Sequence, residues 1–536
     1  MLREYKFVIT ILFLTALLSC AKRGRPTGGE KDVTAPILVS ASPNQNSTNF
    51  DAKKIKIFFD EYIKLKDVNR QLVTSPPLKY NLDITPLGTA SKTITLKIKD
   101  TLKENTTYTF NFGKSVVDNN EENELERFKY VFSTGDYIDS LKLSGTVYDA
   151  FKRTTDEDIS VMLYEMNEFF SDSLIYKEKP LYITSTLDST YFELTNLKAG
   201  KYVMVAIKQP SNNYIYNQKQ DKLGFVSSII TLPTDSVYQI PVFKEIVPFK
   251  LLKPVETSKG HIFFGFEGDG QDLSVKLLNN STNDFNEVAV FEQDKDTLSY
   301  WYQNVELDSL IFEVKNFDFS DILTVKLRSS KKDSLIISNK IRSALEIRDT
   351  FSITTNIPIT KIDTSKISLI NRDSLNIPFQ VILNAYKNRM LVNFEKEFLQ
   401  EYSLQMLPET IADIFGNTND TLSYKLRTKL QENYGTINLN VPNVKSSVII
   451  QLINEKDKLI ETVFIDQPQT IKFKNLLPDT YIVRAILDEN ENGKWDTGNY
   501  FQKKYPEKVI YFETPLELRA NWDLNESFIL NWDLIR

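Results

Sequence analysis

Short segments in which apolar and polar residues alternate recur along almost the whole chain. They include residues 54–59 (KIKIFF), 92–98 (KTITLKI), 107–112 (TYTFNF) and 127–132 (RFKYVF). A period of two with β-branched and aromatic residues predicts strands that bury one face. Helical periodicity is weak, and the best short helix candidates are residues 394–401 and 408–414. The sequence therefore predicts an all-β chain of tandem β-sandwich modules in an elongated array.

The composition permits several packed cores and excludes several kinds of function. The chain has 536 residues, of which 41% are hydrophobic and 12% aromatic, enough for roughly three to five domains. A net charge of −6 indicates no basic face for phosphate backbones, so we expect no nucleic-acid partner. With Cys20 as the single cysteine, the chain can form no internal disulfide, and the folded modules can hold no thiolate metal site.

The single histidine restricts catalysis in the same way. His261 opens the alternating run of residues 261–264, which predicts a residue at the edge of a strand rather than the base of a Ser-His-Asp triad. A hydrolase that uses only carboxylates stays open as an alternative, because 71 Asp and Glu residues are present. Nothing in the sequence pairs any two of them, so we expect a non-enzymatic protein.

The beginning of the chain has the pattern of an export signal. Arg3 and Lys6 precede an apolar run at residues 7–19, which ends at Cys20. Residues 17–20 (LLSC) resemble a bacterial lipobox, and this resemblance implies a signal peptide at residues 1–19 and a lipid on Cys20. The alternative is an incidental cysteine in an ordinary signal peptide or signal anchor. Residues 20–32 are Gly-rich and charged, which predicts a flexible tether.

The remaining residues divide into five predicted modules. Residues 33–137 (the first module) resemble the bacterial Ig-like domain of surface-layer proteins, on motifs such as 34–39 (TAPILV) and 130–135 (YVFSTG). Residues 138–247 (the second module) resemble transthyretin-like, carboxypeptidase-regulatory sandwiches, on 144–147 (SGTV) and 192–202 (FELTNLKAGKY). Residues 248–342, the third module, form a further β-sandwich. Both resemblances imply modules without catalytic residues of their own.

An internal repeat accounts for the last two modules. Residues 471–481 align without a gap on residues 192–202, which places Tyr481 on Tyr202. Tyr402 and Thr428 lie at one constant offset from Tyr108 and Thr134. Residues 343–430 (the fourth module) are therefore predicted to be Ig-like, and residues 431–536 (the fifth module) transthyretin-like.

The fifth module contains a candidate cation loop at residues 488–499 (DENENGKWDTGN). Oxygen ligands at alternate positions, with a glycine sixth, suit Ca²⁺. The proposed ligands of this structural ion are Asp488, Asn490, Asn492, the carbonyl of Lys494, and Asp496. The alternative is a polar loop held by Asx turns, because the first copy of the repeat has no carboxylate at the matching positions. For the acidic residues 118–124, a solvated loop is preferred to a metal site.

Ten hydroxyl residues follow an aspartate in a pattern that resembles the O-glycosylation sequon of exported Bacteroidota proteins. The alternative is the start of a strand after a turn, and both can hold together. These residues are Thr101, Ser140, Ser173, Ser189, Ser236, Thr297, Ser309, Ser334, Ser374 and Thr421.

Aromatic residues gather near the end of the chain. Packing into the core of the last sandwich is preferred to an exposed platform that binds a glycan or a protein. The residues are Trp495, Tyr500, Phe501, Tyr505, Trp522 and Trp532.

The whole length resembles a group of Bacteroidota lipoproteins with Ig-like domains. This resemblance implies an outer-membrane lipoprotein that serves as a binding or scaffolding arm for envelope proteins or glycans. The lipid anchor makes the membrane one partner, and an outer-membrane or envelope protein is expected as another. Ala21 is not acidic, which favours the outer membrane over the inner membrane, and the basic tether favours the periplasmic face over the cell surface. An accessory subunit of an outer-membrane assembly, transport or secretion complex is the alternative.

Overall fold

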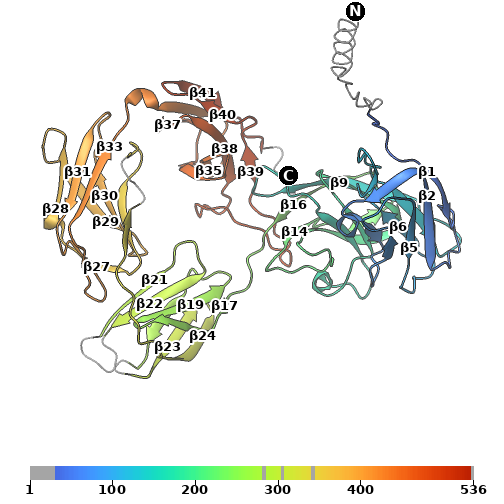
Figure 1. The fold of residues 1–536 in the computed structure, drawn as a ribbon, viewed down its shortest axis with the longest axis horizontal. Coiled ribbons are helices and arrows are strands. Elements are labelled where there is room, and N and C mark those ends of the chain that lie inside the picture. The colour runs from blue at the N-terminus through green and yellow to red at the C-terminus, as the bar shows by residue number, and fades with distance from the viewer. Residues whose placement is uncertain (1–30, 280–284, 304–306, 340–343, 533–536) are drawn as a thin grey trace, which may run out of the picture.

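The computed structural model describes residues 31–279, 285–303, 307–339 and 344–532. Its regular elements are almost all β-strands (Figure 1), which confirms the predicted all-β class of tandem β-sandwich modules. The described helices are single turns that connect strands. They are α2 (Val68–Gln71), η1 (Asp172–Tyr176), η2 (Thr364–Lys366) and η3 (Gln431–Asn433).

The first and fourth modules have the same strand pairing. In each, one sheet pairs β1-β2-β5-β4 or β25-β26-β30-β29, and a facing sheet pairs β3-β6-β8 or β28-β31-β33. Strands β7 and β32 pair with β2 and β27, respectively. The first module contains β1 (Leu38–Ser42), β2 (Lys54–Leu65), β3 (Val73–Ser75), β4 (Asp83–Thr85), β5 (Ser91–Lys97), β6 (Thr107–Asn111), β7 (Val116–Asp118) and β8 (Lys129–Ser133). The fourth contains β25 (Ile337–Asn339), β26 (Phe351–Thr355), β27 (Ile359–Ile362), β28 (Ile367–Asn371), β29 (Phe379–Leu383), β30 (Arg389–Phe394), β31 (Glu401–Met406), β32 (Ile411–Asp413) and β33 (Leu422–Arg427).

The second and fifth modules also share one plan, which includes a parallel pair between the first and last strand of each module. In the second module, β14 also pairs with β16 and joins the two layers into one sheet. The second module contains β9 (Leu141–Asp149), β10 (Ser160–Glu165), β11 (Tyr182–Ser185), β12 (Tyr191–Leu197), β13 (Gly200–Lys208), β14 (Lys222–Phe225), β15 (Ile230–Leu232) and β16 (Val237–Phe243). The fifth contains β34 (Gly435–Val441), β35 (Val448–Asn454), β36 (Leu459–Ile465), β37 (Gln469–Leu476), β38 (Asp479–Leu487), β39 (Val509–Tyr511), β40 (Leu516–Leu518) and β41 (Asp523–Ser527).

The third module packs one sheet around β19 and β22 against the sheet β20-β23-β24. Phe264, Tyr300 and Phe312 lie at its centre and are fully buried. Its strands are β17 (Lys250–Leu251), β18 (Val255–Ser258), β19 (His261–Glu267), β20 (Ser274–Leu277), β21 (Asn286–Phe291), β22 (Thr297–Gln303), β23 (Ser309–Asn316) and β24 (Phe319–Lys326).

Equivalent hydrogen bonds support the repeat of the Ig-like modules. The phenol oxygen of Tyr108 accepts from the backbone N–H of Lys103 at 2.9 Å, and that of Tyr402 accepts from Glu397 at 2.8 Å. The hydroxyl of Thr134 donates to the carbonyl of Lys103 at 2.7 Å. In the fourth module, Thr428 donates to the carbonyl of Glu397 at 2.6 Å. The constant offset in sequence therefore corresponds to one local structure, built twice.

The transthyretin-like repeat is supported in the same way. The hydroxyl of Tyr202 donates to the carbonyl of Lys198 at 2.8 Å, and that of Tyr481 donates to Leu477 at 2.8 Å. Asn196 has a φ of 60° and its partner Asn475 a φ of 55°, a left-handed conformation that asparagine tolerates better than most residues. The asparagine therefore turns the chain between two strands in both copies.

Two details of the sequence prediction are wrong. Residues 394–401 run from the last residue of β30 to the first residue of β31, residues 408–414 contain all of β32, and neither segment is helical. Their short apolar runs are the buried positions of strands, which periodicity alone does not separate from a helical turn. The predicted boundary after residue 342 also differs, because β25 pairs with β26 and belongs to the sheet of the fourth module.

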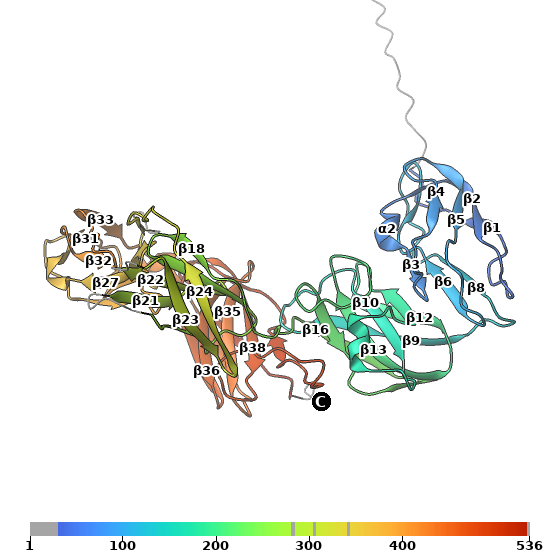
Figure 2. The same cartoon turned by 90° about the horizontal axis from the view of Figure 1, so that it is seen from below.

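The array is not a straight rod. Figures 1 and 2 show the first module at one end of the molecule, whereas the chain of the later modules returns, so that the fifth lies beside the second. The third and fourth modules share an apolar cluster that includes Trp301, Ile357 and Ile414. The contact between the fifth and second modules closes a circuit that runs through the second, third, fourth and fifth modules.

Candidate functional site

The loop between β38 and β39, residues 488–508, leaves its own sandwich and packs on the second module. Tyr500 is completely buried there, with its ring 5.5 Å from that of Phe225. Its backbone N–H donates to Oε1 of Glu245 at 2.7 Å, and Oε2 of the same carboxylate accepts from the hydroxyl of Tyr216 at 2.9 Å. Glu245 is itself only 4% exposed. One buried carboxylate therefore joins the two modules.

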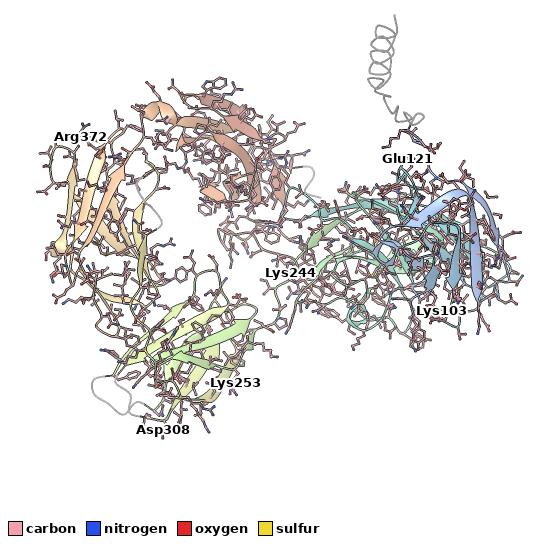
Figure 3. All side chains as sticks on the ribbon, in the orientation of Figure 1. Lys103, Glu121, Lys244, Lys253, Asp308 and Arg372 are labelled. Carbon is pink, nitrogen blue, oxygen red and sulfur yellow. The ribbon has the colours of Figure 1, made fainter. Side chains whose placement is uncertain are left out.

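Neighbouring aromatic residues widen this contact. The ring of Tyr505 stacks on Phe225 at 4.8 Å, and its hydroxyl accepts from the backbone N–H of Ser227 at 2.9 Å. Phe501 stacks on Tyr176 at 5.6 Å. The hydroxyl of Thr497 donates to the carbonyl of Lys244 at 2.6 Å, in the segment that leaves the second module (Figure 3).

The preferred prediction for the aromatic residues is therefore wrong for four of the six. Trp495, Tyr500, Phe501 and Tyr505 pack against the second module and not in the core of their own sandwich. Trp532 does pack against that core, whereas Trp522 is 51% exposed. Sequence alone gives the apolar character of a side chain but not which of two surfaces it covers.

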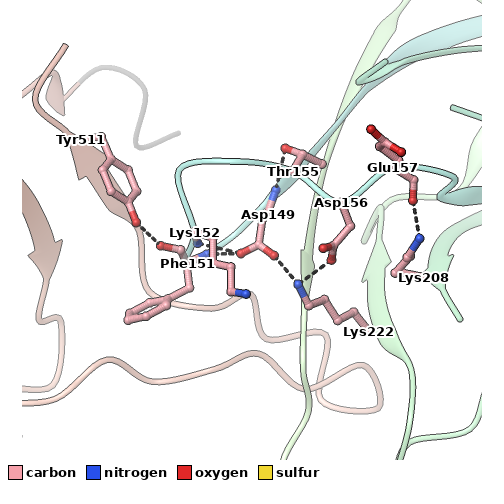
Figure 4. A network of polar contacts seen from close by, with 9 residues as sticks. All are labelled: Asp149, Phe151, Lys152, Thr155, Asp156, Glu157, Lys208, Lys222 and Tyr511. Carbon is pink, nitrogen blue, oxygen red and sulfur yellow. Dashed lines mark hydrogen bonds and ion pairs between the residues drawn. The ribbon is translucent and has the colours of Figure 1, made fainter. Parts of the chain in front are cut away.

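A loop of the second module also contacts the fifth module. Its β9–β10 loop places the ring of Phe151 under the guanidinium of Arg484, 4.1 Å from the ring centre. The hydroxyl of Tyr511 donates to the carbonyl of Phe151 at 2.7 Å (Figure 4). Asp149 shapes this loop by accepting from the backbone N–H groups of Phe151 and Lys152. The interface is thus reciprocal, with one loop from each module.

The phenols of this interface are held in their neutral form. Burial raises the pKa of Tyr216 well above its ordinary value, and the adjacent carboxylate of Glu245 raises it further. Burial likewise raises the pKa of Tyr500, together with Asp172. Asp172 accepts from the hydroxyl of Tyr500 at 3.0 Å and from the ammonium of Lys503 at 2.7 Å. Both tyrosines therefore remain hydrogen-bond donors across the neutral range.

The predicted cation loop, residues 488–499, contains Trp495 and lies directly before Tyr500. Oδ1 of Asp488 accepts from the backbone N–H of Asn492 at 3.0 Å, and Oδ2 accepts from Gly493 at 2.9 Å. Gly493 has a φ of 75° and turns the chain back as expected. Asp496 accepts from the side-chain amides of Asn490 and Asn492. These bonds are those of the Asx-turn alternative, and Ca²⁺ remains a prediction.

Glu507 is a loop residue that sequence reasoning missed. Its carboxylate accepts from the backbone N–H groups of Glu489 and Asp496, both at 3.0 Å, and it is 5% exposed. Burial raises its pKa, and the nearby Asp496 and Asp488 raise it further. Within the described ranges, no group of three or more His, Cys, Asp and Glu side chains is placed to hold a metal ion. The sequence signal for this loop was its length, because residues 488–508 are longer than the matching loop of the first copy, residues 209–221.

The acidic residues 118–124 form a loop organised by its first member. Asp118 is 1% exposed and accepts from the backbone N–H groups of Asn120, Glu121, Glu122 and Asn123. Burial acts to raise the pKa of Asp118, but these four donors lower it below its ordinary value. The carboxylate of Asp118 therefore stabilises the turn.

A cleft of about 760 Å³ lies between the first and second modules. Its cations are engaged: Arg70 pairs with Asp158, and Lys222 lies 2.6 Å from both Asp149 and Asp156 (Figure 4). Asp158 is the single carboxylate among the residues that line the cleft. A carboxylate-based glycosidase needs two, so this cleft does not support the hydrolase alternative.

His261 lies at the start of β19 and is 6% exposed. Its ring stacks on Trp301 at 3.5 Å, and its nitrogens lie 3.0 Å from Thr257 Oγ1 and 3.1 Å from Ser299 Oγ. Burial lowers the pKa of His261 to about 4. Both ring nitrogens lie against hydroxyl groups and not against the carboxylate that a Ser-His-Asp triad requires, and the described contacts of the ring all lie within the third module.

The ten candidate glycosylation residues are all exposed or half-buried. Thr297 and Ser309 are the first residues of β22 and β23, and Ser140, Ser236 and Thr421 directly precede strands. Both interpretations of the pattern therefore stay open. Cys20, the predicted signal peptide at residues 1–19 and most of the predicted tether lie outside the described residues. No helix in the described part of the chain is long and apolar enough to cross a membrane.

Comparison with known proteins supports the Ig-like prediction for the first module. Residues 32–134 match the bacterial Ig-like domain family. No curated protein matches the chain. An array that contains such a bacterial Ig-like domain is compatible with a binding or scaffolding role.

Solved structures of several surface proteins are similar at low identity. The S-layer protein rSbsC is 11% identical, with 91% of this chain and 68% of that chain covered, at a TM-score of 0.14. The major pilin subunit BcpA of Bacillus cereus is 9% identical, with 73% and 99% covered, at 0.15. The BSP domain of a biofilm-associated protein is 8% identical, with 87% and 97% covered, at 0.15. These scores lie below the level at which a shared overall arrangement follows.

Proposed function

We propose that this chain is a non-enzymatic lipoprotein of the outer membrane, anchored through Cys20, that acts as a scaffolding arm for envelope proteins or glycans. The export pattern of residues 1–20 supports the anchor. The Ig-like domain at residues 32–134 supports a binding or scaffolding role.

The contact between the second and fifth modules carries the scaffolding proposal. A chain of freely jointed modules would present its surfaces in many relative positions. Here Glu245 bonds to Tyr500, and Phe151 packs under Arg484, from opposite sides of one interface. Fixing two distant parts of the chain in this way reduces the entropy that is lost when a partner binds both parts.

Lipid labelling tests the anchor. Cells that produce the wild type or the Cys20→Ser variant are fed an alkyne analogue of palmitate. We expect label and membrane retention for the wild type, and neither for the variant. A Cys20→Ser protein that stays in the membrane would instead indicate a signal anchor and would contradict the lipoprotein proposal.

Affinity purification of the full chain from membranes, followed by mass spectrometry, tests the role. An envelope protein recovered with the wild type and lost with a variant that opens the interface, such as Tyr500→Ala, would support the scaffold. Recovery of a β-barrel protein in a fixed ratio would favour the accessory-subunit alternative.

Intact-mass measurement of the exported protein tests whether the ten hydroxyl residues carry glycans. A mass equal to that of the lipidated chain alone would exclude glycans.

A further inference from the structure

The outer face of the first sheet carries three lysines that form no ion pair within the described part of the chain. Lys54 and Lys97 are directly opposite one another across β2 and β5, and Lys56 follows two positions along β2 on the same face. All three are exposed, whereas Ile55, Ile57 and Leu96 between them are buried. Like charges directly opposite on a sheet repel one another. This arrangement disfavours the free state and is relieved by an anion.

Neighbouring groups leave this face positive. Asp83, opposite Lys97 on β4, is paired with Lys99 at 2.6 Å. Asp60, farther along β2, accepts from the backbone N–H of Ile37. Ser42 lies opposite Lys56, and the rest of the face between these residues is Thr, Ser and a half-buried Phe58. The net charge of −6 therefore conceals a local basic surface.

The repeat within the chain shows that the fold itself does not require these lysines. Buried Phe351 and Val392 pair in the fourth module as Ile55 and Leu96 pair in the first. The next outward residues in the fourth module are Ser352 and Asn393, where the first module has Lys56 and Lys97. The lysines thus belong to the module that follows the tether, and not to the Ig-like plan.

The position of the tether identifies the partner. Residues 21–32 can span at most about 40 Å even when fully extended, and the chain then continues into β1, which is paired with β2 of the same sheet. Figures 1 and 2 show β1 and β2 at the end of the molecule away from the third and fourth modules, and Lys54, Lys56 and Lys97 are exposed. A face so close to a lipid anchor meets phosphate headgroups before any other anion.

We propose that the outer face of β2 and β5, through Lys54, Lys56 and Lys97, docks the first module on anionic lipid headgroups. This proposal rests on the lipid anchor for its geometry, but its chemistry is separable. Each lysine near an anionic surface contributes roughly a fivefold gain in partitioning. The three ammonium groups together give roughly a hundredfold, which holds the first module flat and sets the direction of the later modules.

Vesicle sedimentation tests the docking without the lipid anchor. The chain from Ala21 to Arg536, which contains every described residue, is mixed with vesicles of phosphatidylcholine with or without 30% phosphatidylglycerol. We expect binding to the anionic vesicles only, weakened at 0.5 M NaCl because salt screens exposed charges. The triple variant Lys54→Ala, Lys56→Ala, Lys97→Ala should lower the partition coefficient roughly a hundredfold.

The matched control is Lys472→Ala with Lys474→Ala, two exposed lysines at the same spacing on β37, with Asn438 opposite Lys472. We expect this variant to bind as the wild type does. Circular dichroism checks that all three proteins are folded. Equal binding to neutral vesicles, equal loss in both variants, or binding to soluble polyglutamate but to no vesicle would overturn the proposal. None of these results would affect the labelling of Cys20.

Discussion

The backbone N–H of Tyr500 donates a hydrogen bond of 2.7 Å to Oε1 of Glu245, across 255 positions of the chain. Both residues are buried, and they belong to two copies of one repeated module. The contact makes the array a closed circuit in which the fifth module returns to the second. This closure fixes the second and fifth modules relative to one another.

We expect Tyr500→Ala to open the circuit. Truncation of a buried aromatic side chain costs about 3–5 kcal/mol, and here most of that cost falls on the contact between modules. Small-angle X-ray scattering should show a larger radius of gyration and a longer maximum dimension.

The control for the opening is Trp522→Ala, an exposed aromatic residue of the same module that makes no such contact. Glu245→Gln should keep the circuit closed, because the amide oxygen still accepts from Tyr500. An unchanged scattering profile for Tyr500→Ala would show that the remaining contacts suffice without it.

His261 should not titrate in the neutral range. Its pKa in the folded chain is lowered to about 4 by burial, whereas an unfolded histidine titrates near 6.5. The unfolded state therefore binds more protons between these values, so the stabilisation is complete above pH 6.5 and is lost as the pH falls toward 4. From pH 7.5 to 5, the loss is about 2 kcal/mol.

The measurement is NMR of the chain labelled at histidine. Without a purification tag, the chain has a single histidine, so the signal belongs to His261 alone. Its resonances should stay constant from pH 8 to 5.5, and those of the urea-unfolded chain should move near pH 6.5. Titration near pH 6.5 in the folded protein would contradict the buried position on Trp301.

Tyr202→Phe and Tyr481→Phe should destabilise their modules by similar amounts. Each change removes one hydroxyl bond of 2.8 Å to a backbone carbonyl, at a cost of about 1 kcal/mol. Urea unfolding followed by fluorescence checks the size of the effect. The exposed Tyr137→Phe change serves as the control and should have no effect, and a large difference between the two buried sites would argue against equivalent local structures.

The loop at residues 488–496 should bind Ca²⁺ weakly, with a dissociation constant on the order of 10⁻⁴ to 10⁻³ M. Binding requires the amides of Asn490 and Asn492 to turn their oxygens inward, away from the bonds that they now donate to Asp496. Isothermal titration with Ca²⁺ measures it, and Asp496→Asn should abolish it. Asp118→Asn is the control, and a flat titration of the wild type up to 10 mM would leave the loop as an Asx turn.

The alternating pattern was sufficient to predict the class of fold, because each strand carries its own buried and exposed faces, and the aligned motifs were sufficient to predict the repeat. Residues such as Ile55 and Ile57, or Tyr202 and Tyr481, have the same local role in any arrangement of the modules. The alternation failed at residues 394–401 and 408–414, where the apolar runs are too short to define a period.

The tertiary structure alone decided what the aromatic loop covers and how the charges group. Tyr500 is apolar in sequence whether it packs on the fifth module or on the second, and the choice depends on a surface built by residues far away in the chain. The lysines at 54, 56 and 97 form one face only through the register of β2 and β5. Local periodicity determines strands, whereas contacts between distant segments determine surfaces, because those contacts depend on the placement of whole modules.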